Sequence, residues 1–194
     1  MRISYIVSAF NSSRFLPCLL GSLAVQTDQD FEVLVTDNTV DEDKALAIRR
    51  VCRISDVKHI RYVNTRQTTC YHSAETGVGL VQGEFVCFPS DDNYYMPTFG
   101  EAMYRTASAN GADLVLCEMI FDGRRGGRYS VMDTKAAFGH VDKGGFILRR
   151  DKFQPFPGKP DTDIPCGADG MLIDQLVASG ISHIKLPDIL VVHN

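Results

Sequence analysis

The sequence predicts a single α/β domain with a mainly parallel central sheet flanked by helices. Short apolar runs typical of buried strands alternate with segments of helical spacing through the first half of the chain. Such alternation implies parallel strands that are joined by right-handed helical crossovers. The 194 residues are enough for one sizeable core, and no linker, internal repeat or low-complexity segment divides them.

The first half contains four strand-like runs, and a polar segment follows each of them. The runs cover residues 3–7, 31–36, 60–63 and 85–88. The segments between the runs place apolar residues at i, i+3, i+4 and i+7, which is the spacing of one helix face. We therefore expect helices over residues 16–24, 41–52 and 71–81, with Gly83 near the C-terminal cap of the third.

The second half continues with a less regular order of elements. We expect a helix that begins after residue 97 and ends near Gly111, and a second one that follows Asp169 and is closed by Gly180. Strands are expected at residues 114–121, 145–148, 184–186 and 189–192. Residues 122–134 are rich in Gly, Arg and Ser and predict a loop or hairpin, whereas residues 152–166, with four prolines, predict irregular structure.

Composition excludes several classes of protein. A net charge of −4 argues against a nucleic-acid binder held by a basic field. The six cysteines lack both zinc-site spacing and the pattern of a disulfide framework, so we expect a reducing compartment, the cytoplasm. No apolar run approaches the roughly 20 residues of a transmembrane segment, and the N-terminus opens into a strand rather than a signal peptide.

Polar side chains follow several of the predicted strands. Asp91 and Asp92 come after the strand at 85–88, Asp37 ends the strand at 31–36, and Asn11 follows the first strand. The carboxyl ends of parallel strands share one edge of a sheet, where ligands bind in open α/β folds. Two adjacent carboxylates suit Mg²⁺ or Mn²⁺ that bridges to a phosphate, although either Asp can also be a turn or helix-capping residue.

Several segments, in this order, resemble the glycosyltransferases of family 2. The similar segments are residues 6–11, 26–37 and 82–85, with Asp91 and Asp92 standing at the metal site of the DXD type. The resemblance runs from residue 3 to residue 193. It implies a GT-A fold, a Rossmann-like single domain, in which residues 1–97 bind a nucleotide sugar and residues 98–194 bind the acceptor. It also implies inverting transfer of a sugar from a nucleotide-diphosphate sugar, with a UDP-sugar as the expected donor, to a hydroxyl of a glycan or other acceptor.

The resemblance assigns five residues to the donor nucleotide. Ala9, Phe10 and Asn11 would line its pocket, Asp37 would contact the uracil base, and Arg66 would lie near the nucleotide. Three of them have a plainer alternative from residue type and position. Asp37 can be a turn residue, Phe10 can be buried without touching a ligand, and Arg66 can be an exposed, solvated side chain.

The resemblance also implies a site for Mn²⁺ or Mg²⁺. Asp92 would ligate the metal directly, Asp91 would contact the ribose or the metal, and His193 would meet the metal or the diphosphate. The cation would neutralise charge on the leaving diphosphate as a Lewis acid. Because His193 stands near the last residue of the sequence, a frayed end is the alternative there.

Asp169 is the expected general base that takes the proton of the acceptor hydroxyl. It precedes a late helix, where family members often carry Glu-Asp, but Ala168 replaces the Glu here. The alternative is that Asp169 only caps this helix and interacts with its dipole. In that case the base would be sought at Asp161 or Asp163.

Two departures from the family and two rival functions remain. Pro89 stands where many relatives have a first Asp, and the lack of Trp rules out the Gln-x-x-Arg-Trp signature of processive synthases.

A nucleotidyltransferase is one rival, but the loop after the first strand has no glycine, and such enzymes use a Gly-rich loop for a triphosphate. The other rival is a catalytically silent module that binds nucleotide sugars. A homo-oligomer and a place within a longer transferase both stay open.

Overall fold

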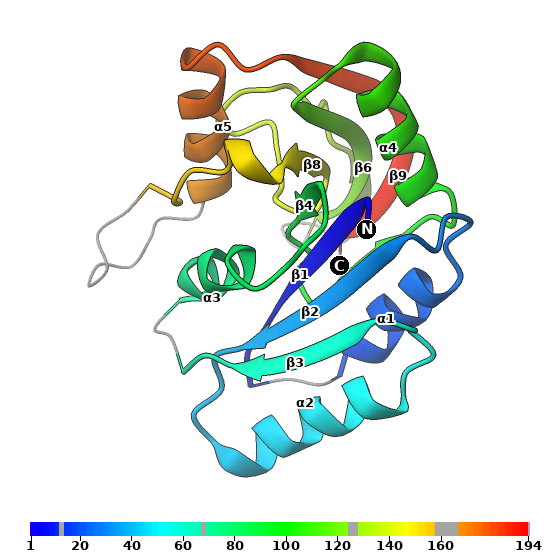
Figure 1. Ribbon diagram of the computed structural model, residues 1–194, viewed down its shortest axis with the longest axis vertical. Coiled ribbons are helices and arrows are strands. Elements are labelled where there is room, and N and C mark those ends of the chain that lie inside the picture. The colour runs from blue at the N-terminus through cyan, green and yellow to red at the C-terminus, as the bar shows by residue number, and fades with distance from the viewer. Residues whose placement is uncertain (12–13, 67–68, 124–127, 158–166, 194) are drawn as a thin grey trace.

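A computed structural model describes residues 1–11, 14–66, 69–123, 128–157 and 167–193 (Figure 1). The described strands form one mixed sheet in the order β3-β2-β1-β4-β8-β6-β9-β5, with β7 paired to β6. The fold is thus the single α/β domain that the sequence predicts. The fallback bases Asp161 and Asp163 lie outside the described residues.

The first half builds the parallel part of the sheet. Its elements are β1 (Ile3–Ala9), α1 (Leu16–Ala24), β2 (Phe31–Asp37), α2 (Glu42–Ile54), β3 (Ile60–Asn64), α3 (Cys70–Val78) and β4 (Phe85–Cys87). Strand β1 pairs in parallel with both β2 and β4, and β2 pairs in parallel with β3. The carboxyl ends of these strands therefore share one edge, as expected for helical crossovers.

The second half adds antiparallel strands beside β4. Its elements are β5 (Asn93–Tyr95), α4 (Phe99–Asn110), β6 (Leu114–Gly123), β7 (Arg128–Val131), β8 (Phe146–Arg149), a 3₁₀ turn (Arg150–Lys152), α5 (Ala168–Ala178) and β9 (His183–His193). Strand β8 runs antiparallel to both β4 and β6, whereas β9 runs parallel to β6. Strands β6 and β7 form the hairpin that was one of the two alternatives for residues 122–134.

One strand of this half was not expected, and one expectation was wrong in detail. Residues 93–95, ahead of the expected helix, form the short strand β5, because they pair antiparallel with the end of β9. The two strands expected at 184–186 and 189–192 are one long strand, β9. Its pairing with β6 shifts register around Glu118, and Pro187 opposite this irregular stretch has no N–H to give to the ladder.

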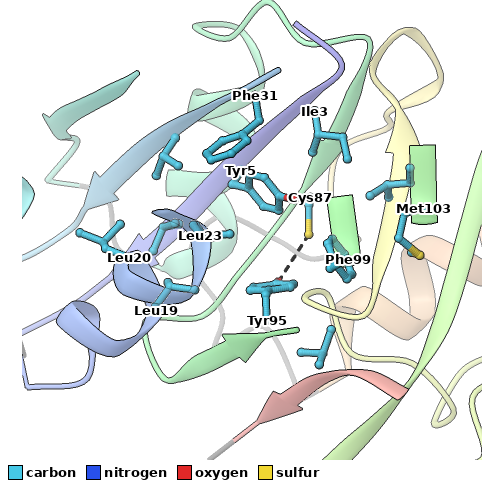
Figure 2. Packing of buried hydrophobic residues seen from close by; sticks show 14 of the residues in the cluster. Ile3, Tyr5, Leu19, Leu20, Leu23, Phe31, Cys87, Tyr95, Phe99 and Met103 are labelled. Carbon is cyan, nitrogen blue, oxygen red and sulfur yellow. Dashed lines mark hydrogen bonds between the residues drawn. The ribbon is translucent and has the colours of Figure 1, made fainter. Parts of the chain in front are cut away.

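Helices cover both faces of the sheet, because side chains of each strand alternate between them. Helices α1 and α2 lie on one side of β1–β3, and α3 lies on the other (Figure 1). The larger core contains Tyr5, whose ring meets that of Phe31 edge to face at 5.4 Å, and Leu19 and Phe99 pack in the same cluster (Figure 2). The smaller core holds Ile6 and Leu172, so it joins β1 to α5.

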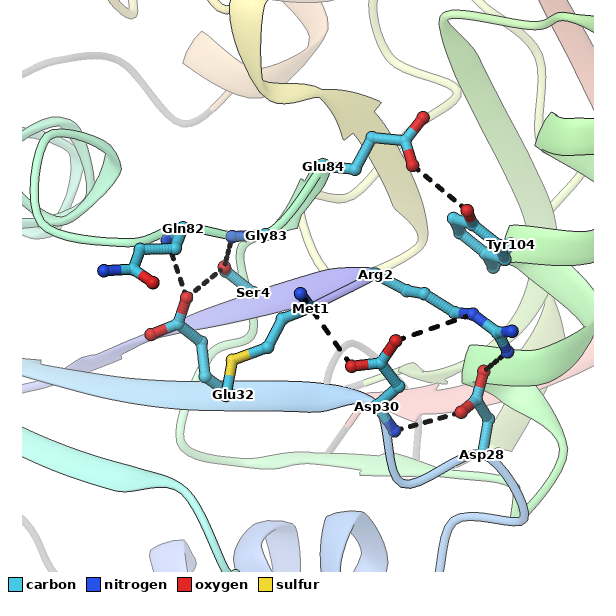
Figure 3. Close-up of polar contacts among 10 residues, drawn as sticks. All are labelled: Met1, Arg2, Ser4, Asp28, Asp30, Glu32, Gln82, Gly83, Glu84 and Tyr104. Atoms are coloured by element: carbon cyan, nitrogen blue, oxygen red, sulfur yellow. Dashed lines mark hydrogen bonds and ion pairs between the residues drawn. The ribbon is translucent and has the colours of Figure 1, made fainter.

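Polar contacts fix the opposite, amino-terminal end of the strands (Figure 3). Glu32 is buried in β2 and accepts hydrogen bonds from Ser4 Oγ at 2.9 Å and from the N–H of Gln82 at 2.7 Å. Arg61 donates a third, of 2.8 Å, to the same carboxylate. These bonds tie β1, β2, β3 and the turn before β4 together, and they leave the carboxyl edge free to carry a site.

None of the helices in the described part of the chain combines the length and the apolar character needed to cross a membrane.

Candidate active site

The polar residues at the strand ends meet at one edge of the sheet, as the sequence predicts. Ala9 and Asp37 are register partners in β1 and β2, and Ser8 forms a parallel bridge with Ser90, just before Asp91. The N–H of Asn11 donates a 2.7 Å hydrogen bond to Thr39 Oγ1, which joins the loop after β1 to the loop after β2. The edge thus carries the ends of β1, β2 and β4 side by side.

An open pocket of about 490 Å³ lies at this edge. Its wall comes from the ends of β1 and β4, the start of α3, the hairpin strands, the loop before β8 and the start of α5. It is lined by Ser8, Ala9, Phe10, Cys70, Tyr71, Ser90, Asp91, Phe121, Met132, Val141, Asp142, Lys143, Gly167 and Asp169. The pocket therefore brings Ala9, Phe10 and Asp91 of the predicted donor site together with Asp169, the predicted base.

Phe10 lines this pocket, whereas Asn11, the next residue, is not among the lining residues, so its contact with the nucleotide stays a prediction. The side chain of Phe10 is 54% exposed, so the alternative of a buried Phe10 is wrong. Asn11 has a φ of 54°, a left-handed conformation that Asn tolerates better than most residues. A ring held at the surface beside an open pocket can stack against a planar base.

Asp37 lies beneath the edge instead of lining the pocket. Its side chain is fully buried, Oδ1 accepts the N–H of Thr39 at 2.8 Å, and Oδ2 accepts the hydroxyl of Tyr62 at 2.6 Å. Burial first and then the bond to Asp37 raise the pKa of Tyr62, which keeps its proton on this bond. Asp37 is thus a turn residue, as its plainer alternative holds, and contact with uracil stays a prediction.

Arg66 lies in a neighbouring hollow and not in the main pocket. It has a φ of 50°, and its N–H donates a 3.0 Å hydrogen bond to Asn64 Oδ1. It lines a space of about 410 Å³ with Tyr62 and residues of α2. Arg66 follows the carboxyl end of β3, at the same edge of the sheet, and a role near the nucleotide stays a prediction.

Asp91 and Asp92 differ in their surroundings. Burial raises the pKa of Asp91 to about 6, with the adjacent charge of Asp92 as the next cause. Asp91 lines the pocket, whereas the side chain of Asp92 is 15% exposed and turns toward His193, with 3.9 Å between its Oδ1 and His193 Nδ1. Asp91 and Asp92 form a turn between β4 and β5, and their carboxylates have different neighbours.

His193 belongs to β9 and is not a frayed end. Its register partner is Asn93, and its ring stacks on Phe121 at 4.7 Å. Nδ1 lies 2.9 Å from Asn93 Nδ2 and 4.0 Å from Asp142 Oδ2. Since Asn93 Oδ1 accepts the N–H of Ser90 at 2.7 Å, the amide nitrogen of Asn93 is the end that faces the imidazole.

This donor set fits a divalent cation that is completed by its ligand. Within the described ranges, no three His, Cys, Asp or Glu side chains are arranged as a ready metal site. Asp92 and Asp142 nevertheless approach His193 from two elements, and carboxylate oxygens are the ligands that Mg²⁺ and Mn²⁺ prefer. Such cations are commonly held by one or two carboxylates together with substrate phosphates.

Asp169 lies in the first turn of α5 but is not its capping residue. The N-cap is Gly167, and Asp169 Oδ1 accepts the N–H of Gly170 at 2.9 Å. Its other oxygen, Oδ2, accepts the N–H of Lys143 at 3.1 Å. Burial, followed by the charge of Asp142, raises the pKa of Asp169, which is the direction that suits a proton acceptor.

The sequence did not identify Asp142 and Lys143 as site residues. They precede Gly144 and the strand β8, and a charged pair before Gly-Gly is typical of an ordinary turn. The close approach of this loop to β5 depends on Gly144, because a Cβ there would lie 2.6 Å from Asn93 Oδ1. That contact joins residues far apart in the sequence, so the pattern alone could not show it.

Comparison with known proteins places this geometry in a family. Residues 4–168 match the model of the family described as Glycosyl transferase family 2. The chain is 26% identical to EpsH of Bacillus subtilis over 142 residues, which are 73% of this chain and 40% of that protein. It is 27% identical to the cholesterol galactosyltransferase of Borreliella burgdorferi over 121 residues, 62% of this chain and 33% of that protein. The chain thus spans less than half the length of these relatives.

Two solved structures share the fold. Residues 1–349 of Staphylococcus aureus TarS superpose with a TM-score of 0.77 and 20% identity, over 100% of this chain and 60% of that one. The mannosyltransferase PcManGT of Pyrobaculum calidifontis, in complex with GDP-Man and Mn²⁺, gives a TM-score of 0.77 and 19% identity, over 99% of this chain and 56% of that one. TarS 1-349 has also been solved in complex with UDP-GlcNAc.

Proposed function

Because the chain belongs to glycosyl transferase family 2, we propose that it transfers a sugar from a nucleotide-diphosphate sugar to an acceptor hydroxyl. The observation that carries this proposal is the single pocket that holds both Asp91 and Asp169. One carboxylate stands at the end of a parallel strand, where phosphates and their cations bind, and the other stands across the pocket with a raised pKa. The family removes the rival reading as a nucleotidyltransferase.

We propose UDP-sugars as donors. The exposed ring of Phe10 offers a face for stacking a base, and Asp37 lies under the loops that would surround it. The TarS structure with UDP-GlcNAc and the PcManGT structure with GDP-Man are precedents for both kinds of nucleotide on this fold. Asp37, buried and engaged by Thr39 and Tyr62, would act by holding the turn at the base, or directly after local opening.

We propose inversion at the anomeric carbon, with Asp169 as the base. The acceptor oxygen forms the new glycosidic bond, and its proton passes to Asp169 Oδ2 or Oδ1. The bond from the anomeric carbon to the diphosphate oxygen breaks, and its electron pair leaves with the diphosphate. A raised pKa helps Asp169 to accept the proton, and burial excludes water that would compete with the acceptor.

A divalent cation fits this scheme as a Lewis acid that would lower the charge on the diphosphate when bound. Asp92, Asp142 and His193 are the residues that would hold it. Asp91 then would face the ribose or the sugar from its place in the pocket wall. The acceptor and the linkage are set by residues of the second half.

We also propose a cytoplasmic location, because the cysteines are scattered and lack the pattern of a disulfide framework.

The experiment is a donor panel. Purified protein is incubated with UDP- and GDP-linked hexoses and N-acetylhexosamines, with Mn²⁺ or with EDTA, and release of the nucleoside diphosphate is measured. We expect release from at least one UDP-sugar, stimulated by Mn²⁺. Binding of nucleotide sugars without release, in the presence of a broad set of hydroxyl acceptors, would instead identify a silent binding module.

A further inference from the structure

A buried lysine lies in the pocket, and the mechanism above does not use it. Lys143 is 7% exposed, although lysine is among the residues that are rarely buried without a partner. It stands in the loop before β8, where its backbone N–H is fixed by Asp169. Burying an ammonium is costly unless an opposite charge or hydrogen-bond acceptors receive it. The groups around the ammonium of Lys143 should therefore indicate which ligand it binds.

The ammonium of Lys143 has no close carboxylate in the free protein. Among the described residues no carboxylate oxygen lies within 4.0 Å of Nζ, although Asp91, Asp142 and Asp169 all line the same pocket. Its defined contact is with the ring of Tyr71, whose centroid is 5.7 Å from Nζ. A lysine that served only to pair with the pocket carboxylates would close on one of them. This one instead extends toward the start of α3.

The charge of Lys143 nevertheless reaches both functional carboxylates. Burial raises the pKa of Asp91 and of Asp169, and in each case Lys143 opposes that rise. The ammonium is therefore near enough to both carboxylates to act on them, and all three residues line the same pocket. An anion bound in this pocket would meet the positive charge of Lys143, which acts on both Asp91 and Asp169.

The wall beside Lys143 adds a second source of positive potential. Cys70 and Tyr71, the first two residues of α3, line the pocket, and the N-cap is Thr69. Helix α3 runs over nine residues, so the positive end of its dipole lies at this wall of the pocket. Ser8 Oγ holds this turn against β1 through a 3.3 Å bond to the carbonyl of Cys70. A helix start and an ammonium together favour an anion.

We propose that Lys143 binds the diphosphate of the donor, with the start of α3 on the same wall, and so recognises the leaving group independently of the metal. This inference rests on the proposed function. The ammonium donates hydrogen bonds to phosphate oxygens and offsets the charge that they gain when the anomeric C–O bond breaks. Lys143 is then a binding residue for the donor. The diphosphate is held by Lys143 and the start of α3 on one side and by the proposed metal site on the other.

The test compares UDP with uridine, which share the base and ribose and differ in the diphosphate. Affinities are measured by calorimetry for the wild type, Lys143→Met and Lys143→Arg, in Mn²⁺ and again in EDTA. We expect Lys143→Met to weaken UDP at least about tenfold while uridine binding is unchanged, because one charge-assisted contact is lost. Lys143→Arg should retain UDP affinity within about threefold, since it keeps the charge. The exposed Lys58, at the other end of the strands, provides the control Lys58→Met, which should bind both ligands as the wild type does.

The outcomes separate this inference from the proposed function. UDP binding to the wild type with an unchanged affinity in Lys143→Met would overturn the role of Lys143 and leave the transferase proposal in place. Failure of the wild type to bind any nucleoside diphosphate would overturn both. Should Lys143→Met not fold, Lys143→Gln takes its place. Equal dependence of UDP and uridine affinity on salt in the wild type would also contradict an anion site.

Discussion

The backbone N–H of Lys143 donates a 3.1 Å hydrogen bond to Oδ2 of Asp169. This bond joins the loop before β8 to the first turn of α5, two segments on different elements of the second half. It fixes the carboxylate that we propose as the base and leaves the side chain of Lys143 to extend toward α3. This hydrogen bond thus holds the carboxylate of Asp169 and the ammonium of Lys143 in the same pocket without pairing them with each other.

Replacing Asp169 by Asn should abolish most transfer without unfolding the protein. The amide can still accept the N–H groups of Lys143 and Gly170, but it cannot take the acceptor proton. Positioned proton transfer contributes about 10² to 10⁴ in rate, so we expect a loss of at least about a hundredfold. The measurement is the transfer rate at saturating acceptor, with thermal melting and donor affinity as controls. A rate within a few-fold of the wild type would reduce Asp169 to a residue that stabilises α5.

Glu32 should stabilise the fold above, but not below, the ordinary pKa range of a carboxyl. Burial alone would raise its pKa, but hydrogen bonds from Gln82, Ser4 and Arg61 outweigh burial and lower it. A lowered folded-state pKa gives stability that is fully present above the unfolded value and is lost as pH falls through the folded value. We therefore expect Glu32→Gln to be less stable than the wild type at pH 7.

The difference in the free energy of unfolding between the wild type and Glu32→Gln should shrink once pH falls below 4.5, the ordinary pKa of a glutamate carboxyl. Urea unfolding of both proteins at several pH values measures this difference. Asp56→Asn, at an exposed position after α2, is the control for simple loss of a negative charge. A gap that is constant from pH 7 to pH 3 would show that packing, and not the ionised carboxylate, is what the substitution removes.

Tyr62→Phe should destabilise the turn that follows β2. It removes the hydroxyl that donates to Asp37 Oδ2 at 2.6 Å, and Asp37 is fully buried. An unsatisfied buried group costs about 1 to 3 kcal/mol, and more when it is charged. The free energy of unfolding measures the loss, and Tyr129→Phe, at a side chain that is 65% exposed, is the matched control. Equal losses in the two variants would mean that the bond to Asp37 contributes nothing of its own.

Gly144→Ala should disturb the site through Asn93. The added Cβ would lie 2.6 Å from Asn93 Oδ1, which accepts the N–H of Ser90 next to Asp91. We expect Asn93 to shift, with loss of its contact to His193 and a drop in metal-stimulated turnover. Gly21→Ala is the control, because its Cβ meets nothing within 4 Å in the middle of α1, where Ala is favoured by about 0.5 to 1 kcal/mol. Full activity of Gly144→Ala would show that the loop can yield without moving Asn93.

Local patterns predicted most of the fold and one edge of the site. The spacing of apolar residues predicts α1 and the strands β1, β2 and β4. Parallel pairing of these strands then brings Ala9, Asp37 and Asp91 to one edge of the sheet. Asp169 was predicted from the resemblance to the family, whose members carry an Asp before this helix. These features depend on contacts within one element or between successive elements.

The remaining features depend on contacts between distant segments. Strand β5 exists because Asn93 pairs with His193 at the far end of β9, and three residues carry too little pattern to predict it. The hydrogen bond from the backbone N–H of Lys143 to Asp169 and the approach of Asp142 to His193 are likewise contacts between segments far apart in the sequence. Asp37 was assigned to uracil by resemblance, whereas its burial follows from Tyr62 on β3, which pairs beside it.

The most direct test of the active-site assignment is turnover of a UDP-sugar by the wild type and Asp92→Asn across a Mn²⁺ titration. Asn keeps the shape of the side chain but removes a charge that the cation needs. We expect turnover of the wild type to rise with Mn²⁺ and saturate, and turnover of Asp92→Asn to stay at the level found in EDTA, with an unchanged melting temperature. Superimposable Mn²⁺ curves for the two proteins would contradict a metal-assisted glycosyltransferase site at this edge of the sheet.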